Sequence, residues 1–528
     1  MDLLPMLERL SNPEAYPNSV KSVELRQTHI SVVCVTNDIV YKIKKPVKFS
    51  FLDFSSLEKR RFYCEREVEL NRRLALDVYL GVVPIVFAEG RLRVDAPGEP
   101  IEWAVKMRRL PEAASLEQRL LRDEVGPQLI KLLARRVAGF HAAAPADSRI
   151  ARYGSFDAVA KSILDNLIVG RIRDATLMDD VLFARLEKLT GQRLESSRAL
   201  IDQRAGRGVP RDTHGDLHLD HVYVFPERLP PADLCIIDCI EFNEEFRYID
   251  PIADVAFLVM DLKFHGRGDL ARVLTDEYFD ATGDSEGRQL LPLYVSYRAA
   301  VRAKVETLEL AEVEIPEAER LLAAERARGH WLLALSELEK PFRRPCLLLV
   351  GGLPGTGKTT LARRLAEVAD FCVIRSDIVR KELAGLSETS SSATAYQTGL
   401  YSTEWTERTY AECLRRAEEL LQHGGRVIID ATFSQEAHRR RFLAAAQRLA
   451  LPGLCLICQS DPEVIHRRLQ ERIGDASDAD WKIYLAAAEK WEPASNRTAQ
   501  VLNTIDSGRT GEFACEQAIQ TLRNAELL

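Results

Sequence analysis

Short apolar runs alternate with amphipathic stretches over the last third of the chain. Between these runs, apolar residues recur every three or four positions, which predicts helices. Strands that alternate with helices form a parallel sheet with helices on both faces, and ligands gather at the carboxyl ends of its strands. The pattern therefore predicts an α/β domain. Its predicted strands are residues 347–350, 371–374, 427–429, 454–458 and 501–505.

The first part of the chain has β-branched runs and turns instead. Residues 29–47 predict two strands joined by a turn, and strand alternation puts Val40, Lys42 and Lys44 on one face. On that face Val40 would cover a purine while Lys42 reaches phosphate. The alternative is an edge strand with solvated lysines, which is common.

A helix is predicted over residues 56–76 from apolar residues three and four positions apart. Glu67 lies on its apolar stripe, where a carboxylate needs a cation, and Lys42 is the natural partner. Glu65, on a neighbouring face, is the alternative acid. A solvated carboxylate at the edge of the stripe is the purely structural interpretation.

Helical periodicity dominates the middle of the chain up to residue 339. Pro341 and Pro345 interrupt it just before the first strand of the α/β pattern, so a domain boundary is predicted there. The first domain is expected to be α+β, with a strand-rich lobe and a helical lobe. The predicted domains are residues 1–340, with lobes over about 1–110 and 111–340, and residues 341–528.

Composition narrows the class of protein. A chain of 528 residues is too long for one hydrophobic core, and its 72 basic and 79 acidic residues disfavour general electrostatic capture of nucleic acid or membrane. No apolar run approaches the ~20 residues that span a bilayer, and the first residues lack the order of a secretory signal. The ten cysteines are scattered, and Cys455 and Cys458 fall in a predicted strand, which predicts buried reduced thiols. We therefore expect a cytoplasmic protein without membrane segments.

A phosphate-binding loop joins the first strand of the α/β pattern to the helix that follows. Residues 352–359 read GLPGTGKT and match GxxxxGK[ST], in which glycines turn backbone amides toward a polyphosphate. Lys358 would reach the β and γ phosphates of ATP, and Thr359 would place its hydroxyl on Mg²⁺. An ordinary glycine-rich turn does not explain the lysine and hydroxyl after the last glycine. The predicted nucleotide-binding residues are Gly352, Leu353, Pro354, Gly355, Thr356, Gly357, Lys358, Thr359 and Thr360.

Charged residues follow the later strands at the same edge of the predicted sheet. Asp377 and Arg380 stand one helical turn apart after the second strand, and Arg468 and Arg472 share a helix face after the fourth. Simpler interpretations are a helix N-cap for Asp377 and a solvated face for the arginines. Their joint placement after successive strands is the stronger signal.

The third strand ends at Asp430, where an acid that holds Mg²⁺ or its water is expected. Ala431 follows it in place of the glutamate that mechanical P-loop ATPases use to polarise water. Transfer to a hydroxyl is therefore favoured over hydrolysis.

Residues 345–510 resemble the P-loop kinases that include gluconate kinase, zeta toxins, chloramphenicol phosphotransferase and polynucleotide kinase. The resemblance implies that Asp377 accepts the proton of the acceptor hydroxyl and that Arg380, together with Thr432, holds the acceptor. It also implies a lid whose arginines stabilise the transferred phosphoryl group. The arginines in that place are Arg468 and Arg472.

Two segments of the first domain carry a second resemblance. Residues 213–221 read THGDLHLDH, and residues 235–238 read CIID at the end of an apolar strand. They resemble the aminoglycoside phosphotransferase group, kin to choline kinases and built on the bilobal protein-kinase fold. The resemblance extends loosely over residues 1 to about 330.

Roles follow position by position from that resemblance. Asp216 would be the catalytic carboxylate, Asp238 would hold Mg²⁺, and Lys42 with Glu67 would form the phosphate-holding ion pair. Two features depart from the family. His221 stands where the family has a metal-binding asparagine, and the first hairpin has no glycine-rich loop.

A metal cluster of a hydrolase is the rival interpretation of the same segment. In the kinase interpretation the first two histidines are structural, with rings that hydrogen-bond the loop. The cluster residues would be His214, Asp216, His218, Asp220 and His221.

The whole chain resembles a bacterial fusion of an aminoglycoside-phosphotransferase-like half with a P-loop kinase half. It predicts an ATP- and Mg²⁺-dependent kinase that phosphorylates a hydroxyl, on a small molecule more readily than on nucleic acid, at the C-terminal site. The N-terminal half would be a second kinase, making the protein bifunctional, or a degenerate one that binds the acceptor or regulates its neighbour. The alternatives are an ATP-binding switch with a pseudokinase half, and a metallohydrolase fused to a kinase.

Overall fold

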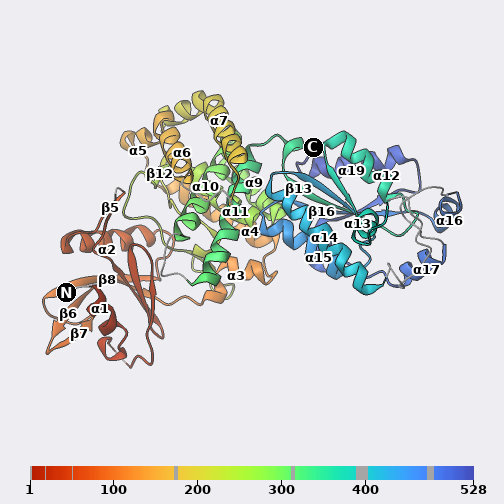
Figure 1. Ribbon diagram of the computed structural model, residues 1–528. Coiled ribbons are helices and arrows are strands. Elements are labelled where there is room, and N and C mark those ends of the chain that lie inside the picture. The colour runs from red at the N-terminus through yellow and green to blue at the C-terminus, as the bar shows by residue number, and fades with distance from the viewer. Residues whose placement is uncertain are drawn as a thin grey trace. The chain divides into compact units, whose positions relative to one another are not determined.

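The computed structural model describes residues 3–17, 19–49, 51–171, 177–310, 316–387, 402–471 and 481–528 (Figure 1). By their contacts these residues form two compact units. Unit 1 comprises residues 1–162, 197–262 and 269–294, and unit 2 comprises residues 163–196, 263–268 and 295–528. No helix among the described residues combines the length and the apolar character that a membrane crossing needs.

The division between the units does not follow the break in the sequence pattern at residue 340. The helix α11 (Glu317–Leu338) packs on α15 (Glu436–Arg448), and a Cβ on Gly329 would lie 2.9 Å from the Arg448 carbonyl oxygen. The division falls instead inside five helices, one of them α9 (Gly268–Thr282), which it cuts after its first residue. The other four, which are cut further along, are α6 (Phe156–Gly170), α7 (Asp180–Gly206), α8 (Pro251–Phe264) and α10 (Leu291–Glu309).

Unit 1 begins with a six-stranded antiparallel sheet in the order β1-β2-β3-β8-β6-β7. The helix α2 (Leu57–Asn71) starts at Ser56, whose side chain accepts from the Lys59 N–H, and packs on β6 and β8. On β3, Tyr41 and Ile43 belong to the core cluster on the other face, because strand side chains alternate. The strands are β1 (Glu24–Gln27), β2 (Ser31–Val35), β3 (Ile39–Lys44), β6 (Tyr79–Ala88), β7 (Arg91–Val94) and β8 (Pro100–Arg108).

The rest of unit 1 is mainly helical, with three short ladders. The ladders pair β4 (Lys48–Phe49) with β5 (Leu52–Asp53), β9 (Arg211–Asp212) with β12 (Tyr248–Ile249), and β10 (Val222–Val224) with β11 (Leu234–Ile236). The remaining helices of this unit are α1 (Leu3–Leu10), α3 (Leu116–Leu121), α4 (Pro127–Ala143), α5 (Ser148–Tyr153) and α9 (Gly268–Thr282).

Unit 2 contains a five-stranded parallel sheet in the order β14-β15-β13-β16-β17, which confirms the predicted α/β architecture. All six residues of β13 are buried, as expected for a central strand covered on both faces. The strands are β13 (Cys346–Gly351), β14 (Cys372–Arg375), β15 (Arg426–Asp430), β16 (Gly453–Gln459) and β17 (Leu502–Asp506).

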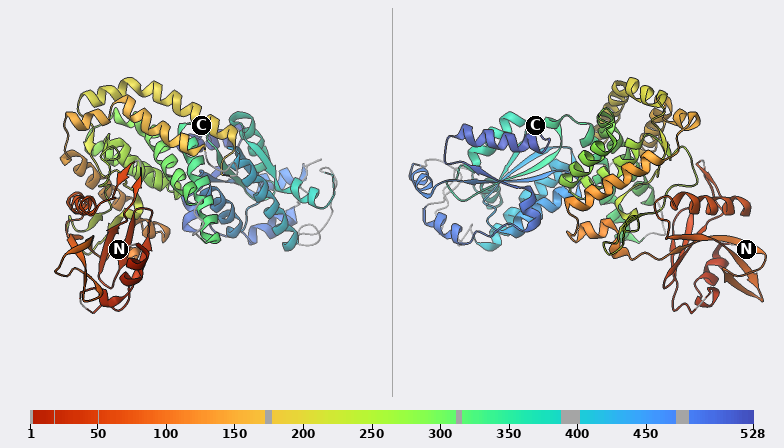
Figure 2. Two further views of the ribbon diagram at one scale, coloured as in Figure 1. Left: turned by 60° about the vertical axis from the view of Figure 1, so that its left-hand side comes forward. Right: turned by 180° about the vertical axis from the view of Figure 1, so that it is seen from behind.

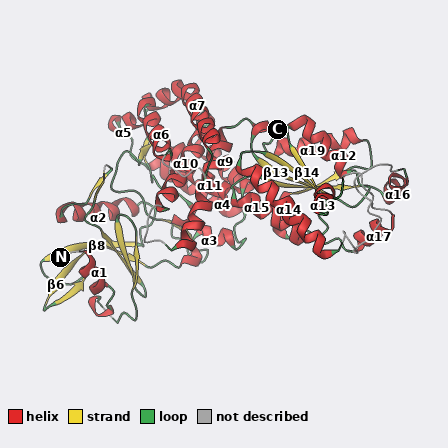
Figure 3. Cartoon of the chain, viewed as in Figure 1, coloured by secondary structure: helices red, strands yellow, loops and turns green. Residues whose placement is uncertain are grey.

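Helices cover both faces of this sheet (Figures 2 and 3). The helices α12 (Lys358–Ala369) and α19 (Gly511–Asn524) share one core cluster with the sheet. The helix α14 (Thr403–Gln422) contacts β13, β14 and β15, and α15 contacts β13 and β16. The further helices are α13 (Ser376–Leu383), α16 (Pro462–Gln470), α17 (Trp481–Glu489) and α18 (Asn496–Val501).

Alkylation should distinguish one cysteine from the other nine. Cys372 at the start of β14 is exposed, whereas the rest are buried reduced thiols, as predicted, and burial raises the pKa of Cys455 and Cys458 to about 12. We expect iodoacetamide to add one group to the native chain, at Cys372, and to reach the others only after denaturation. Peptide mass spectrometry checks this, with Cys372→Ser as control; native labelling of Cys455 would contradict it.

Candidate active sites

The phosphate loop of unit 2 runs from the end of β13 to the first turn of α12. Gly352 has a φ of 144°, and a Cβ there would lie 2.6 Å from Thr356 Oγ1 and 2.7 Å from the Cys458 carbonyl oxygen. Gly357, with a φ of 83°, is the N-cap of α12, and Lys358 is its first residue. Glycine is needed at both positions, and the amides of the first helical turn stay available for an anion.

Asp430 at the end of β15 lies beside this loop. The Thr359 hydroxyl donates to Asp430 Oδ2 at 2.7 Å, because β13 and β15 pair in register from Cys346↔Arg426 to Val350↔Asp430. Burial raises the pKa of Asp430, while the charge of Lys358 and the Thr359 hydrogen bond oppose that shift. Asp430 Oδ1 is buried and has no hydrogen-bond partner among the described residues. A hydroxyl next to an unsatisfied carboxylate oxygen fits Mg²⁺, which prefers oxygen ligands.

The residues after β14 bring positive charge to the same edge. Arg375 Nε lies 3.5 Å from Asp430 Oδ2, and Asp377, in the first turn of α13, is half-buried and close enough to raise the pKa of Asp430. Arg380 is buried on the same helix, and its Nη1 donates to Thr406 Oγ1 at 3.4 Å. Acidic and basic side chains thus meet beside the phosphate loop.

Two further predicted residues border the loop through other contacts. The Thr432 carbonyl oxygen accepts from the Gly352 N–H at 3.1 Å, so its backbone supports the loop. Arg468 Nη2 donates to the Ser507 carbonyl oxygen at 2.8 Å, and its Nη1 is buried with no partner among the described residues. That Nη1 lies 3.7 Å from where a Cβ of Gly357 would be. Arg472 lies outside the described residues.

Unit 1 holds a network of buried charges between β3 and α2. Lys42 Nζ lies 3.0 Å from Glu67 Oε1, and Lys44 Nζ lies 2.7 Å from Glu67 Oε2. Lys44 also pairs with Glu241. Glu67 is fully buried, and burial alone would raise its pKa, but the two ammonium groups hold that pKa below its usual value. The predicted Lys42–Glu67 pair is present, and Glu65 instead pairs with Arg61 on the surface.

Asp238 connects this network to the helical part of the unit. Its Oδ1 accepts from Lys42 Nζ at 2.5 Å, and its N–H donates to the Tyr79 hydroxyl at 3.1 Å. Its φ is 65°, which is uncommon for a residue other than glycine and marks a backbone held by its surroundings. Although burial would raise the pKa of Asp238, the charge of Lys42 keeps it below its usual value.

Hydrogen bonds to backbone N–H groups hold residues 214–216, the HGD segment, in place. The Asp254 carboxylate accepts from the N–H groups of His214 and Gly215 at 3.1 and 2.8 Å and lies 3.1 Å from His141 Nε2. The His214 ring contacts the Ile237 carbonyl oxygen at 2.9 Å, and burial lowers the pKa of His214 to about 4. The His214 ring is therefore neutral, and it faces the Ile237 carbonyl oxygen.

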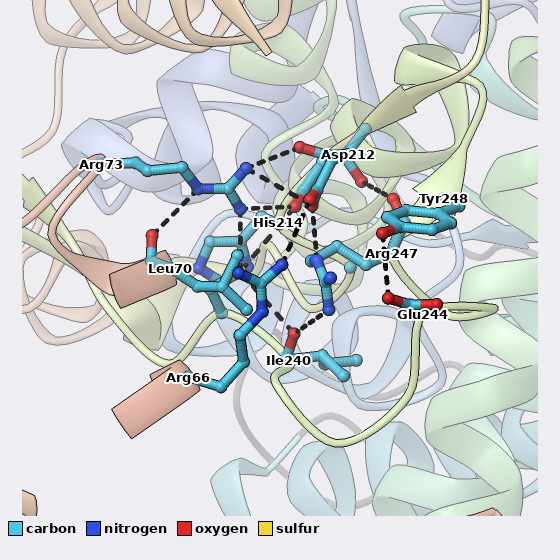
Figure 4. Close-up of polar contacts among 12 residues, drawn as sticks. Arg66, Leu70, Arg73, Asp212, His214, Ile240, Glu244, Arg247 and Tyr248 are labelled. Atoms are coloured by element: carbon cyan, nitrogen blue, oxygen red, sulfur yellow. Dashed lines mark hydrogen bonds and ion pairs between the residues drawn. The ribbon is translucent and has the colours of Figure 1, made fainter. Parts of the chain in front are cut away.

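Two arginines brace the start of the segment (Figure 4). Arg73 donates to the carbonyl oxygens of Asp212 and Thr213 at 2.8 and 3.0 Å. Arg247 donates to Asp212 Oδ1 at 2.5 Å and to the Ile240 carbonyl oxygen at 2.8 Å. The C-terminal end of α2, the HGD segment and the loop after Asp238 are thereby tied together.

The side chains of Asp216, His218 and His221 come together beside Asp238. Asp216 Oδ2 lies 3.4 Å from His218 Nε2 and 3.9 Å from His221 Nδ1, and the two imidazole rings are 3.8 Å apart. Asp238 Oδ2 lies 3.7 Å from His221 Nε2. The structure thus groups three of the five residues of the predicted cluster. The His214 ring instead contacts the Ile237 carbonyl oxygen and accepts from the Asp216 N–H at 3.3 Å.

Comparison with known proteins gives matches to both parts of the chain. The model of the Phosphotransferase enzyme family matches residues 57–291, and an AAA domain model matches residues 347–491. Uncharacterized proteins of Mycobacterium tuberculosis and Mycobacterium bovis are 34% identical over 510 residues, which is 95% of this chain and 96% of theirs. The chain belongs to this two-domain family. The fusion predicted from the sequence is therefore confirmed, and so is the kinase-type character of its two domains.

Solved structures also match about a third of this two-domain protein. A gluconokinase from Sinorhizobium meliloti 1021 is 15% identical, covers 35% of this chain and 95% of its own, and has a TM-score of 0.27. A sugar kinase from Janibacter sp. HTCC2649 is 18% identical, covers 35% and 96%, and has a TM-score of 0.28.

Three residues of the two-domain protein's sites received no role from the sequence: Lys44, Glu241 and Arg375. Lys44 was placed on the correct face, but its partner Glu241 lies 197 residues further along. Arg375 is the last residue of β14, and the end of a strand was a usable signal. His218 was assigned a structural role in the kinase interpretation and a ligand role in the rival one. Pairings this distant in sequence leave no local pattern.

Proposed function

We propose that unit 2 transfers the γ-phosphoryl group of ATP to a hydroxyl of an acceptor. The observation that carries the proposal is Asp430: a buried carboxylate beside the phosphate loop, satisfied on one oxygen by Thr359 and unsatisfied on the other. The loop glycines and the first turn of α12 would bind the phosphates, and Lys358 would neutralise them. Mg²⁺, held by Thr359 and Asp430, would supply charge at the β and γ phosphates.

The acceptor side is assigned to the residues after β14. Asp377 would take the hydroxyl proton as the new oxygen–phosphorus bond forms and the bond to the β-phosphate oxygen breaks, releasing ADP. Arg375 and Arg380 would hold the acceptor and the phosphoryl oxygens, with the lid arginines Arg468 and Arg472 closing the site. A small molecule that carries hydroxyl groups is the proposed acceptor.

Unit 1 supports a second candidate function. Its match to the Phosphotransferase enzyme family and its Lys42, Glu67 and Asp238 network favour a nucleotide-dependent site of its own. Asp216 would then orient the acceptor hydroxyl in unit 1. ATP is the proposed phosphoryl donor here too.

Label transfer tests the assignment of Asp377. γ-Labelled ATP and Mg²⁺ are incubated with the chain and a metabolite and RNA extract, and products are separated. We expect a labelled acceptor with the wild type. With Asp377→Asn the amount of label should fall by at least about 10²-fold while ATP binding is unchanged, because a positioned base contributes about 10²–10⁴-fold.

Two outcomes would contradict the proposal in different ways. Release of inorganic phosphate alone would indicate a nucleotide switch, and full transfer by Asp377→Asn would remove Asp377 as the base. Asp276→Asn, which changes an exposed carboxylate of unit 1, is the matched control and should leave transfer unchanged.

A further inference from the structure

Asp216, His218 and His221 have the chemistry of a metal site. One ligand atom from each of these residues can be chosen so that all three atoms lie within 4.8 Å of one another. His221 ends the short 3-10 helix Leu219–His221, and His218 is the residue before that helix. The turn therefore brings both imidazoles back over the Asp216 side chain.

The separations fit neighbouring ligands around one ion. His218 Nε2 and Asp216 Oδ2 are 3.4 Å apart, which is longer than an ordinary N–H···O hydrogen bond. Bonds of about 2.0–2.2 Å to a tetrahedral metal place its ligands about 3.3–3.6 Å apart. The 3.7 Å between His221 Nε2 and Asp238 Oδ2 is close to the same range.

The outer contacts of the rings also match those of metal-binding histidines. The His218 Nδ1 pairs with Asp220 Oδ1, which leaves Nε2 to face Asp216. The His221 Nδ1 lies 2.9 Å from the Asp216 carbonyl oxygen and can only donate to it, which leaves the Nε2 lone pair facing Asp238. An oxygen acceptor on the far nitrogen is the usual way in which proteins orient an imidazole toward a metal.

We propose that Asp216, His218 and His221 bind a divalent transition-metal ion, Zn²⁺ or Mn²⁺, with Asp238 as a fourth ligand. A metal cation between the two imidazole nitrogens and the two carboxylates would offset the negative charge that these carboxylates bring together. Imidazole nitrogen favours transition metals, whereas Mg²⁺ favours oxygen. The site thus selects a different metal from the phosphate loop of unit 2. It does not depend on the transfer proposed for unit 2, but it shares Asp216 and Asp238 with the second candidate function of unit 1.

Metal titration of the untagged, chelator-dialysed chain without nucleotide tests the site. Zn²⁺ affinity is measured by competition with a chromophoric chelator, and the visible spectrum of bound Co²⁺ reports the ligands. We expect one tight equivalent that millimolar Mg²⁺ does not displace. His218→Gln and His221→Gln should each weaken it at least about 100-fold, and Asp220→Asn, which removes an outer contact, about 10–100-fold.

Matched variants separate this site from other metal binding. His423→Gln removes an exposed histidine of unit 2, and Lys358→Ala alters the phosphate loop; both should bind Zn²⁺ as the wild type does. Wild-type affinity in both His218→Gln and His221→Gln, or displacement by Mg²⁺, would overturn the proposal. If those variants do not fold, electron spin echo spectroscopy of wild-type protein with bound Mn²⁺ decides, because absent imidazole nitrogen coupling would also overturn it.

Discussion

Lys358→Ala is expected to lower phosphoryl transfer from ATP by about 10³-fold or more. Lys358 is the first residue of α12, and its ammonium group would neutralise charge on the phosphates of ATP. Removing such a charge from a preorganised site costs about 10²–10³-fold or more in rate. The protein should still fold, because Lys358 is partly exposed. Single-turnover label transfer from γ-labelled ATP measures the loss.

Two further variants make that result specific to unit 2. Lys340→Ala removes an exposed lysine outside the loop and should transfer label normally. Asp216→Ala, in unit 1, should also retain transfer. Transfer that persists in Lys358→Ala but disappears in Asp216→Ala would move the chemistry to unit 1.

Glu67→Ala is expected to destabilise unit 1 by about 3–5 kcal/mol, the usual cost of leaving a buried charge without its partner. Glu67 is fully buried and pairs with both Lys42 and Lys44, so its loss leaves two ammonium groups that share only Asp238 and Glu241. Urea unfolding followed by hydrogen exchange of peptides from β3 and α2 measures the effect in unit 1 itself.

Glu65→Ala is the matched control on the same helix. The Glu65 side chain is 53% exposed and pairs with Arg61 four residues away, so its loss should cost at most about 0.5 kcal/mol. Equal effects of the two substitutions would contradict the buried network, because solvent would then be screening Glu67 as it screens Glu65.

Local signals in the sequence were enough for the α/β sheet and its loop. Five apolar runs predicted the five parallel strands, since a strand covered on both faces must be apolar throughout. Glycines at Gly352 and Gly357 predicted the loop because positive φ angles and close packing exclude other residues there. The positions of Asp377 and Asp430 followed from the rule that parallel strands end at one edge.

The pairing of distant side chains was less accessible. Strand alternation predicted that Lys42 and Lys44 share a face, but not that both would converge on Glu67 or that Glu241 would join them. The compact units likewise depend on helix packing, such as that of α11 on α15, which no break in the sequence pattern records.

The sequence by itself determined the two-domain kinase-type family, the parallel sheet, the phosphate loop and the identity of the residues that follow each strand, because periodicity, glycine sterics and motif spacing are local. Only the tertiary structure decided which charges meet. It turned His214 into the loop, grouped His218 and His221 over Asp216, and left one oxygen of Asp430 unsatisfied beside Thr359. The contacts of His214 with Ile237 and of Thr359 with Asp430 join residues 23 and 71 positions apart, and folding alone sets the distances between them.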